Sequence, residues 1–580
     1  MMNAQLLIGY KDIYGEPSVP LSHFAAKINL NWAGQFISNV NGAIFFSESN
    51  SQVQELYLNY LIKHWDKSEK VQFYSKVLKK RGYELQIDDL FYFSRHGLLY
   101  LFFEILKLSR NFSTDYRAPS DSDKDNLIKA ILIANDQVNE RVYDEGIDFS
   151  KQTDLRNFKW ATFNLQNQLG HFDPIIKMIK AKCFFDFLEN NAKLSHTVSD
   201  YLKYYESENS WTLLLKKRLT PFIRATSKYR ESGAHTHQLA FIMNDTDKTM
   251  IDNLTLKLDN SFPKTFSLRL FKSQPLLKIS STHFTILDWG LYLEHLFEAI
   301  VFDFFESTNI RELGPYKNFI SFKNNLIDTH FYEGYLLSKI MDFVFPKKFQ
   351  IKLSENEIIN SLKTEKSVPD FYIRDGKNIY LIEFKNCLYP SDIDDTSDSE
   401  KIKKMIDKKL NTSNVGVGQQ IKRIKYLKGN SYENSSESSY PKNRNISIYP
   451  IIIFTDVNFN IPGIGRYLNE SFEKQVDSDL RICFKNIYPL VFIHIDYFIE
   501  YVDLFSKDNQ LFKTHLDRFI KYQIQNDKKG RSKSGKKFMY NEKSEMPFTH
   551  VTRNLFNYEY QRKGFVQSAF DSFDLLQNMD

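Results

Sequence analysis

Three charged side chains are spaced so that they could meet at one end of a β-hairpin. Asp370 precedes one β-rich run, and Glu383 and Lys385 close the next run. Asp375-Gly376 lies between the runs and is a hairpin-turn signal. If the loop covers residues 375–378, the pairing places Asp370 directly opposite Glu383, and a shift of one residue leaves them diagonal neighbours. Glu383 and Lys385 are two residues apart, so they share one face of a strand.

This trio predicts a divalent-metal site. The strand that carries Glu383 is otherwise apolar, and buried charges are costly unless they are paired or bind a metal. Two carboxylates are hard oxygen ligands for Mg²⁺, which also accepts phosphate oxygens. Such a metal lowers the pKa of a bound water and neutralises charge on a phosphate transition state. The ammonium of Lys385 could position that water or stabilise the developing charge.

The arrangement resembles the PD-(D/E)xK nuclease superfamily. Pro369-Asp370, twelve intervening residues and then Glu383-Phe384-Lys385 reproduce its signature in order. The resemblance covers about residues 285–500 and implies a restriction-endonuclease-like fold with Mg²⁺ or Mn²⁺ as cofactor. It also implies that Asp370, Glu383 and the backbone carbonyl of Phe384 bind the metal. The alternative is a surface hairpin that carries an ordinary Glu–Lys pair.

A helix before the hairpin should supply a further acidic residue. The family places a Glu on this helix, and Glu333, in the apolar segment 330–345, is similar in position. The resemblance implies that Glu333 binds the metal or assists it through water, as part of the catalytic set. Glu294 and Glu298, on an earlier predicted helix, are the competing candidates.

A helix after the hairpin should supply a glutamine. Part of the family has a Gln where this later helix opens, and the segment 416–427 looks like that element. Gln420 lies beside the apolar face of this helix, whereas Gln419 turns toward the basic side with Arg423, so Gln420 is the predicted catalytic residue. The family subset often has a Tyr one turn later, where this chain has Ile424, so that part of the match is incomplete.

Basic residues on the same helix predict contact with nucleic acid. Lys422, Arg423 and Lys425 are the candidates for binding backbone phosphates, with DNA as the expected substrate. For any single lysine, a solvated helix face is the competing explanation. The net charge of +6 permits a nucleic-acid partner without indicating one.

The elements around the hairpin predict a multidomain chain. Of the 580 residues, 42% are hydrophobic and 26% charged, as in soluble globular proteins. Residues 1–260 read as a mostly α-helical regulatory or substrate-recognition domain. Helices alternate with strands over 261–510, which predicts an α/β nuclease-like domain with a central mixed sheet. We expect residues 511–580 to form a helical, basic tail.

Other features narrow the compartment and the chemistry. The three cysteines are far apart, which argues against disulfides and structural zinc and favours a reducing compartment. Neither a signal-peptide pattern nor an apolar run of membrane-spanning length is visible, so we expect a cytoplasmic protein without a membrane partner. The pair His235 and His237 lacks further ligand spacing, and Asp456, at the end of an apolar strand, could be functional or a cap.

These observations predict a Mg²⁺-dependent endonuclease. By analogy of architecture, nucleases with large appended domains resemble effectors of prokaryotic restriction and antiphage defence. The alternative is a catalytically silent nucleic-acid-binding, sensor or scaffold protein that a partner activates. The N-terminal domain could then mediate a homodimer or bind another protein.

Overall fold

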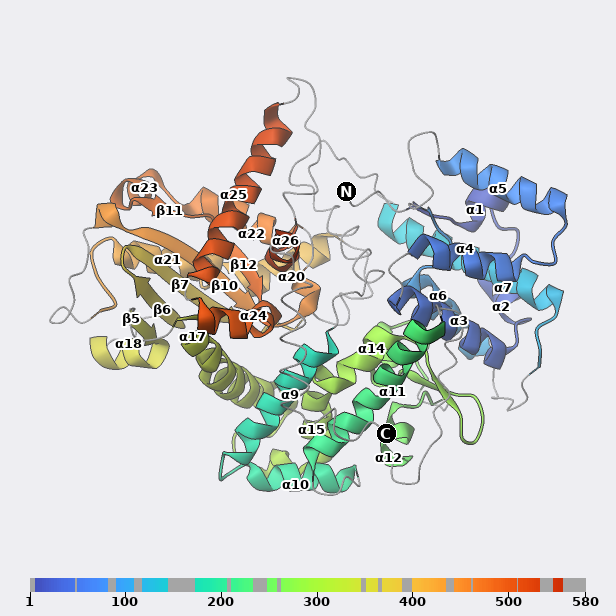
Figure 1. Cartoon of the computed structure of the whole chain (residues 1–580), viewed down its shortest axis with the longest axis horizontal. Coiled ribbons are helices and arrows are strands. Elements are labelled where there is room, and N and C mark those ends of the chain that lie inside the picture. Colours follow the sequence, from blue (N-terminus) through green and yellow to red (C-terminus); the bar gives the residue numbers. More distant parts are fainter. Residues whose placement is uncertain are drawn as a thin grey trace. The chain divides into compact units, whose positions relative to one another are not determined.

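The computed structural model of the chain contains two compact units (Figure 1). Along the sequence, the first unit ends at Ile310 and the main part of the second begins at Arg311. The residues whose structure is described are 6–46, 50–81, 90–108, 117–143, 173–205, 210–232, 248–257, 262–345, 351–363, 368–388, 399–433, 443–460, 463–508, 510–532 and 546–555.

The described part of the first unit is predominantly helical. Its helices are α1 (Tyr10–Tyr14), α2 (Leu21–Ala25), α3 (Leu30–Phe46), α4 (Asn50–Leu61), α5 (Lys67–Arg81), α6 (Arg95–Leu108), α7 (Asp121–Tyr143), α9 (Pro174–Glu189), α10 (Ser195–Tyr204), α11 (Trp211–Ser232), α12 (Lys248–Leu254), α13 (Leu268–Ser273), α14 (Trp289–Leu293) and α15 (Glu298–Ser307). Short strands form two pairs, β1 (Leu6–Leu7) with β2 (Leu90–Phe91), and β3 (Leu276–Lys278) with β4 (Phe284–Ile286).

The sequence analysis had assigned the segment 262–310 to the nuclease-like domain because its start is β-rich. In the structure this segment packs with the helical unit instead. One apolar core joins residues from Ile8 to Leu291. The β3–β4 hairpin is held by α3, because Ser38 donates a hydrogen bond to the carbonyl of Ile286 and Asn41 donates one to that of Leu287. An isolated two-stranded hairpin is marginally stable, so it needs such a helix to pack against.

The second unit is built on one mixed β-sheet. Its strand order is β11–β10–β7–β6–β5. Strand β12 also pairs with β10, further along β10 than the short β11. The strands are β5 (Ile351–Ser354), β6 (Phe371–Asp375), β7 (Asn378–Lys385), β10 (Ser447–Phe454), β11 (Asn486–Ile487) and β12 (Val491–His494). β5, β6 and β7 are antiparallel neighbours, whereas β7, β10 and β12 run parallel. A helical unit followed by an α/β unit with a mixed sheet was the predicted organisation, and at this level it is confirmed.

Helices surround this sheet in the second unit (Figure 1). They are α16 (Phe319–Phe322), the π-helix η5 (Lys323–Leu337), α17 (Ser338–Val344), α18 (Glu355–Leu362), α20 (Ser399–Leu410), α21 (Val417–Leu427), α22 (Ile464–Gln475), α23 (Ser478–Cys483), α24 (Ile495–Lys507), α25 (Leu511–Ser532) and α26 (Phe548–Leu555). A short pair, β8 (Asn411–Thr412) with β9 (Val415–Gly416), leads into α21. None of the described helices combines the length and the apolar composition needed to cross a membrane.

Alternate side chains of the central strand β7 face two different helical layers. Tyr380 packs against Phe345, which follows α17, and against Phe512 of α25, with ring centroids 5.1 and 6.2 Å apart. Glu383 points the other way and pairs with Arg423 of α21. This alternation follows from the two-residue period of a strand. It places the odd-numbered charged residues of β7 between the sheet and α21.

Candidate functional site

The β6–β7 hairpin has the register that the sequence predicted. Its ladder runs from Asp375–Asn378 to Phe371–Ile382, so Asp370 follows opposite Glu383. The turn contains Gly376 at a φ of +59°, a left-handed conformation that favours glycine. The Oδ2 atom of Asp370 accepts a hydrogen bond of 2.5 Å from the backbone N–H of Phe384. The first predicted carboxylate is therefore attached to the strand that carries the second.

Both carboxylate oxygens of Glu383 are ion-paired. Oε1 lies 2.5 Å from Nζ of Lys385, and Oε2 contacts Nη1 of Arg423. Glu383 is 1% exposed, so its charge is almost completely removed from water. A buried carboxylate is tolerable only with such compensation. The predicted sharing of one strand face by Glu383 and Lys385 agrees with this contact.

Arg423 lies in the interior, although the sequence had grouped it with the exposed basic residues of its helix. Its side chain is 2% exposed, and its Nη2 donates a 2.6 Å hydrogen bond to the carbonyl of Val368. Lys422 and Lys425 on the same helix are exposed. Arg423 follows the buried Gln420 by three residues and so shares its face of α21.

Gln420 is the buried member of the glutamine pair that opens α21. Its Nε2 donates to the carbonyl of Leu381 on β7, at 3.1 Å, and to that of Ile451 on β10, at 2.9 Å. Gln419 instead accepts a hydrogen bond from the N–H of Gly416 and caps the helix. Gln420 thus attaches α21 to two neighbouring strands.

The start of α21 is held close to the segment before it. A Cβ on Gly418 would lie only 2.2 Å from the carbonyl oxygen of Thr412, which leaves no space for another residue there without movement of the backbone. This close approach fixes where the helix begins. It therefore helps to determine which residues of α21 face β7.

Glu333 lies on η5, where its charge interacts with Asp370 and Lys385. Burial and the carboxylate of Asp370 raise the pKa of Glu333 to about 8, and Lys385 opposes that rise.

The competing candidates for this role, Glu294 and Glu298, belong to the first unit. Glu298 pairs there with Lys180 and also contacts Lys177.

Glu355 is a residue at this site that the sequence analysis missed. It opens α18 directly after β5, and its backbone N–H donates a 3.0 Å hydrogen bond to the carbonyl of Asp370. Partial burial and the charge of Asp370 raise the pKa of its carboxyl group. The capping-box pattern of Ser354 and Glu357 could have located the start of this helix, because such a pair marks a helix N-terminus.

A polar network supports the chain just after Lys385. The side chain of Asn386 donates a 2.5 Å hydrogen bond to Asp328 and accepts one from Thr455. Lys323 bonds both to Asp328, at 2.6 Å, and to the carbonyl of Asn386, at 2.8 Å. The end of β7 is therefore tied to η5 and to the end of β10.

The donor chemistry of the site fits a divalent cation. The carboxyl groups of Asp370, Glu383, Glu333 and Glu355 interact with two cationic side chains, Lys385 and Arg423. If all four were ionised, they would carry an excess of two negative charges, and carboxylate oxygens are preferred Mg²⁺ ligands. The described residues contain no group of three or more His, Cys, Asp or Glu side chains already gathered around one metal position. Both oxygens of Glu383 are engaged in ion pairs, so a metal would have to displace one of these cations to reach them.

Asp456, the further candidate that the structure describes, has a capping role. Asp456 caps the turn after β10, because its Oδ1 accepts a hydrogen bond from the N–H of Asn458. His235 and His237 lie outside the described residues.

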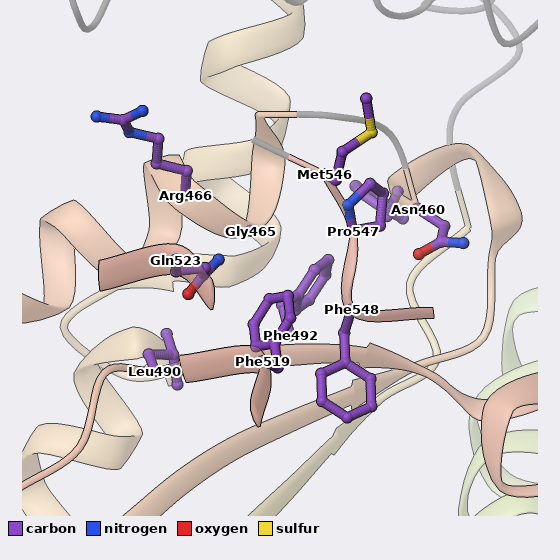
Figure 2. A pocket seen from close by; sticks show the side chains of 11 residues that line it. Asn460, Gly465, Arg466, Leu490, Phe492, Phe519, Gln523, Met546, Pro547 and Phe548 are labelled. Atoms are coloured by element: carbon purple, nitrogen blue, oxygen red, sulfur yellow. The ribbon is translucent and has the colours of Figure 1, made fainter. Parts of the chain in front are cut away.

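A pocket elsewhere in the second unit contains none of the predicted site residues. It is lined by β12, α22, α25 and the start of α26, with Phe492, Phe519 and Phe548 among its walls (Figure 2). Arg466, also at this pocket, pairs with Glu470 on its own helix. The walls are mainly apolar and include no carboxylate, so the pocket lacks the acidic metal ligands that metal-dependent phosphodiester hydrolysis needs.

No protein-family model, curated protein or solved structure matches the chain. The residues and geometry of the hairpin therefore carry the functional argument.

Proposed function

We propose that the second unit is a metal-dependent nuclease of the PD-(D/E)xK type, which hydrolyses phosphodiester bonds of nucleic acid, with DNA as the expected substrate. The observation that carries the proposal is the hairpin register, which brings Asp370 onto the backbone of Phe384 and next to Glu383. The surrounding order supports it, with η5 before the antiparallel β5–β6–β7, α21 after it, and then the parallel strand β10.

The residues of the site take distinct roles in this proposal. Asp370, Glu383 and the carbonyl of Phe384 would hold Mg²⁺ or Mn²⁺. When bound, the metal supplies Lewis-acid activation of water and neutralises charge on the scissile phosphate. Lys385, whose ammonium lies at Glu383, would orient the attacking water and stabilise negative charge on the phosphate. Burial and the charge of Asp370 raise the pKa of Glu333 to about 8, which favours its protonated form at neutral pH in the metal-free site.

The remaining parts would recognise the substrate. Lys422 and Lys425 are exposed on α21, whose buried face contacts the site, so they could bind phosphates beside it. The helical first unit would select the substrate or regulate cleavage. By analogy of architecture, we propose prokaryotic restriction or antiphage defence as the setting in which such a nuclease would act.

Plasmid cleavage with matched variants tests the proposal. Supercoiled DNA would be incubated with the full chain in Mg²⁺, Mn²⁺ or EDTA. Asp370→Asn and Lys385→Met should abolish metal-dependent nicking. The controls are Asp375→Asn and Lys377→Met, at the turn end of the same hairpin, which should cleave like the wild type. Equal cleavage by Asp370→Asn and the wild type would contradict the proposal.

The second candidate function is a catalytically silent nucleic-acid-binding or sensor protein that a partner activates. The observation that favours it is the ion-pairing of both Glu383 oxygens, which leaves neither of them free for a metal. Calorimetric titration with Mn²⁺ distinguishes a silenced nuclease from a protein without a metal site. Mn²⁺ binding that Asp370→Asn abolishes indicates a silenced nuclease, whereas DNA binding without any Mn²⁺ binding indicates a non-catalytic protein.

A further inference from the structure

The two cations at Glu383 differ in how firmly they are held. The Lys385 side chain is 18% exposed. Its Nζ donates a hydrogen bond of 2.5 Å to Oε1 of Glu383. A lysine has a flexible four-carbon stem, so its ammonium can move toward solvent without disturbing the backbone. Lys385 can therefore release Glu383 more readily than a buried, fixed cation could.

Arg423, in contrast, is fixed in the interior. Its guanidinium contacts Oε2 of Glu383 and also donates to the carbonyl of Val368, two residues before Asp370. The helix that carries Arg423 is itself attached to β7 and β10 through Gln420. Withdrawal of Arg423 would break buried contacts with Glu383 on β7 and with Val368, which precedes β6, and such losses are expensive. Arg423 thus stays near Glu383 when Lys385 leaves.

A fixed positive charge at this position opposes a second cation. A divalent metal on Glu383 would lie within a few ångströms of the guanidinium in a poorly solvated site, where like charges repel strongly. The same guanidinium compensates the charge of Glu383 when no metal is present, so a metal adds little further stabilisation to the buried carboxylate. Both effects weaken metal binding.

We propose that Arg423 is a built-in counter-ion of Glu383, which competes with the divalent metal and holds the metal-free site in a self-neutralised state of low metal affinity. This inference rests on the proposed nuclease function and assigns Arg423 a positioning and tuning role, in place of the phosphate contact expected from the sequence. Activation would then require conditions that raise metal occupancy, such as a bound substrate whose phosphate adds negative charge.

The decisive experiment measures Mn²⁺ affinity of the full chain by calorimetry, with Arg423→Gln beside the wild type. Removal of the positive charge should tighten Mn²⁺ binding about tenfold or more. The metal-free variant should melt at a lower temperature, because Glu383 loses a buried partner, and Mn²⁺ should raise its melting temperature more than that of the wild type.

Arg374→Gln is the matched control. Arg374 is also largely buried and pairs with a buried glutamate, Glu433, at 2.8 Å, but at the turn end of β6. This control should lower the melting temperature and leave Mn²⁺ affinity at the wild-type value. Arg423→Lys keeps the charge, so its Mn²⁺ affinity should stay closer to that of the wild type than to that of Arg423→Gln.

The wild type supplies a second readout that does not depend on a variant folding. During a titration with diamagnetic Mg²⁺, the side-chain Nε–H resonance of Arg423 should shift with the binding isotherm, while that of Arg374 stays in place. An unmoved Arg423 resonance, or Mn²⁺ affinity in Arg423→Gln equal to or weaker than that of the wild type, would overturn the inference. If wild-type binding still depends on Asp370, the nuclease proposal survives that result. If neither the wild type nor Arg423→Gln binds metal, both proposals fail.

Discussion

The backbone N–H of Phe384 donates a 2.5 Å hydrogen bond to Oδ2 of Asp370, so one edge of β7 holds the carboxylate that precedes β6. The carbonyl of Asp370 is held at the same time by the N–H of Glu355. Asp370 is consequently fixed through both its side chain and its backbone. In the proposed metal site, a ligand that is already positioned in this way would lose little conformational entropy on binding.

Substitutions of Asp370 should separate its charge from its hydrogen bond. Asp370→Asn keeps an acceptor for Phe384 but removes the charge, so nuclease activity should fall at least 100-fold, by the order of magnitude expected for a catalytic contact. Asp370→Ala also leaves the N–H of Phe384 unpaired and should be about 1–2 kcal/mol less stable than the Asn variant. Urea unfolding measures that difference. Equal stability of the two variants would show that the hydrogen bond contributes nothing.

Stability of the metal-free chain should depend on the protonation of Glu333. Burial and the charge of Asp370 raise its pKa from 4.5 to about 8, so the folded chain retains a proton that the unfolded chain releases above pH 4.5. Stability is therefore greatest, for this group, below pH 4.5, and it declines as the pH rises toward 8.

Urea unfolding in EDTA at pH 5 and pH 8 checks this dependence. Between these pH values the wild type should lose about 1–2 kcal/mol more than Glu333→Gln, a range that allows for partial exposure of the group. Glu473→Gln, on α22, should follow the wild type. Parallel pH profiles for the wild type and Glu333→Gln would contradict the assigned surroundings of Glu333.

Local sequence determines the hairpin, which is why its register could be predicted. The turn signal at Asp375-Gly376 and the two-residue period of the strands both act over a few residues. Together they placed Asp370 opposite Glu383 without knowledge of the rest of the fold. The choice of Gln420 over Gln419 likewise followed from the apolar face of one helix, and Gln420 is the buried residue of the two.

Contacts between distant segments determine what the sequence did not predict. Arg423 stands in a run of basic residues that resembles a solvated helix face, and its contacts with Glu383 on β7 and with the carbonyl of Val368 explain its burial. Glu355 lies on no apolar stripe, and its relation to Asp370 depends on the pairing of β5 with β6. The β3–β4 hairpin resembles the start of an α/β domain, but the helix α3 that it packs against lies more than 200 residues earlier.

Gln420 and Gln419 form a matched pair for testing how α21 is attached. Gln420→Leu removes two buried hydrogen bonds to the carbonyls of Leu381 and Ile451 and should cost about 2–4 kcal/mol. Gln419→Leu removes one capping bond to Gly416 and should cost about 1 kcal/mol. Urea unfolding of both variants gives the comparison. A larger loss for Gln419→Leu would mean that capping, rather than attachment to the sheet, holds this helix.

The exposed lysines of α21 should contribute to nucleic-acid affinity through phosphate contacts alone. Binding of duplex DNA would be measured at several salt concentrations in the Asp370→Asn background, which prevents cleavage. Changing both Lys422 and Lys425 to Gln should weaken binding and reduce the slope of log affinity against log salt by about 2, one unit for each phosphate contact. The control changes Lys474 and Lys485, which are exposed on other parts of the second unit, and should leave the slope unchanged. If both double variants reduce the slope equally, the basic face of α21 has no special part in binding, and general positive charge explains the affinity.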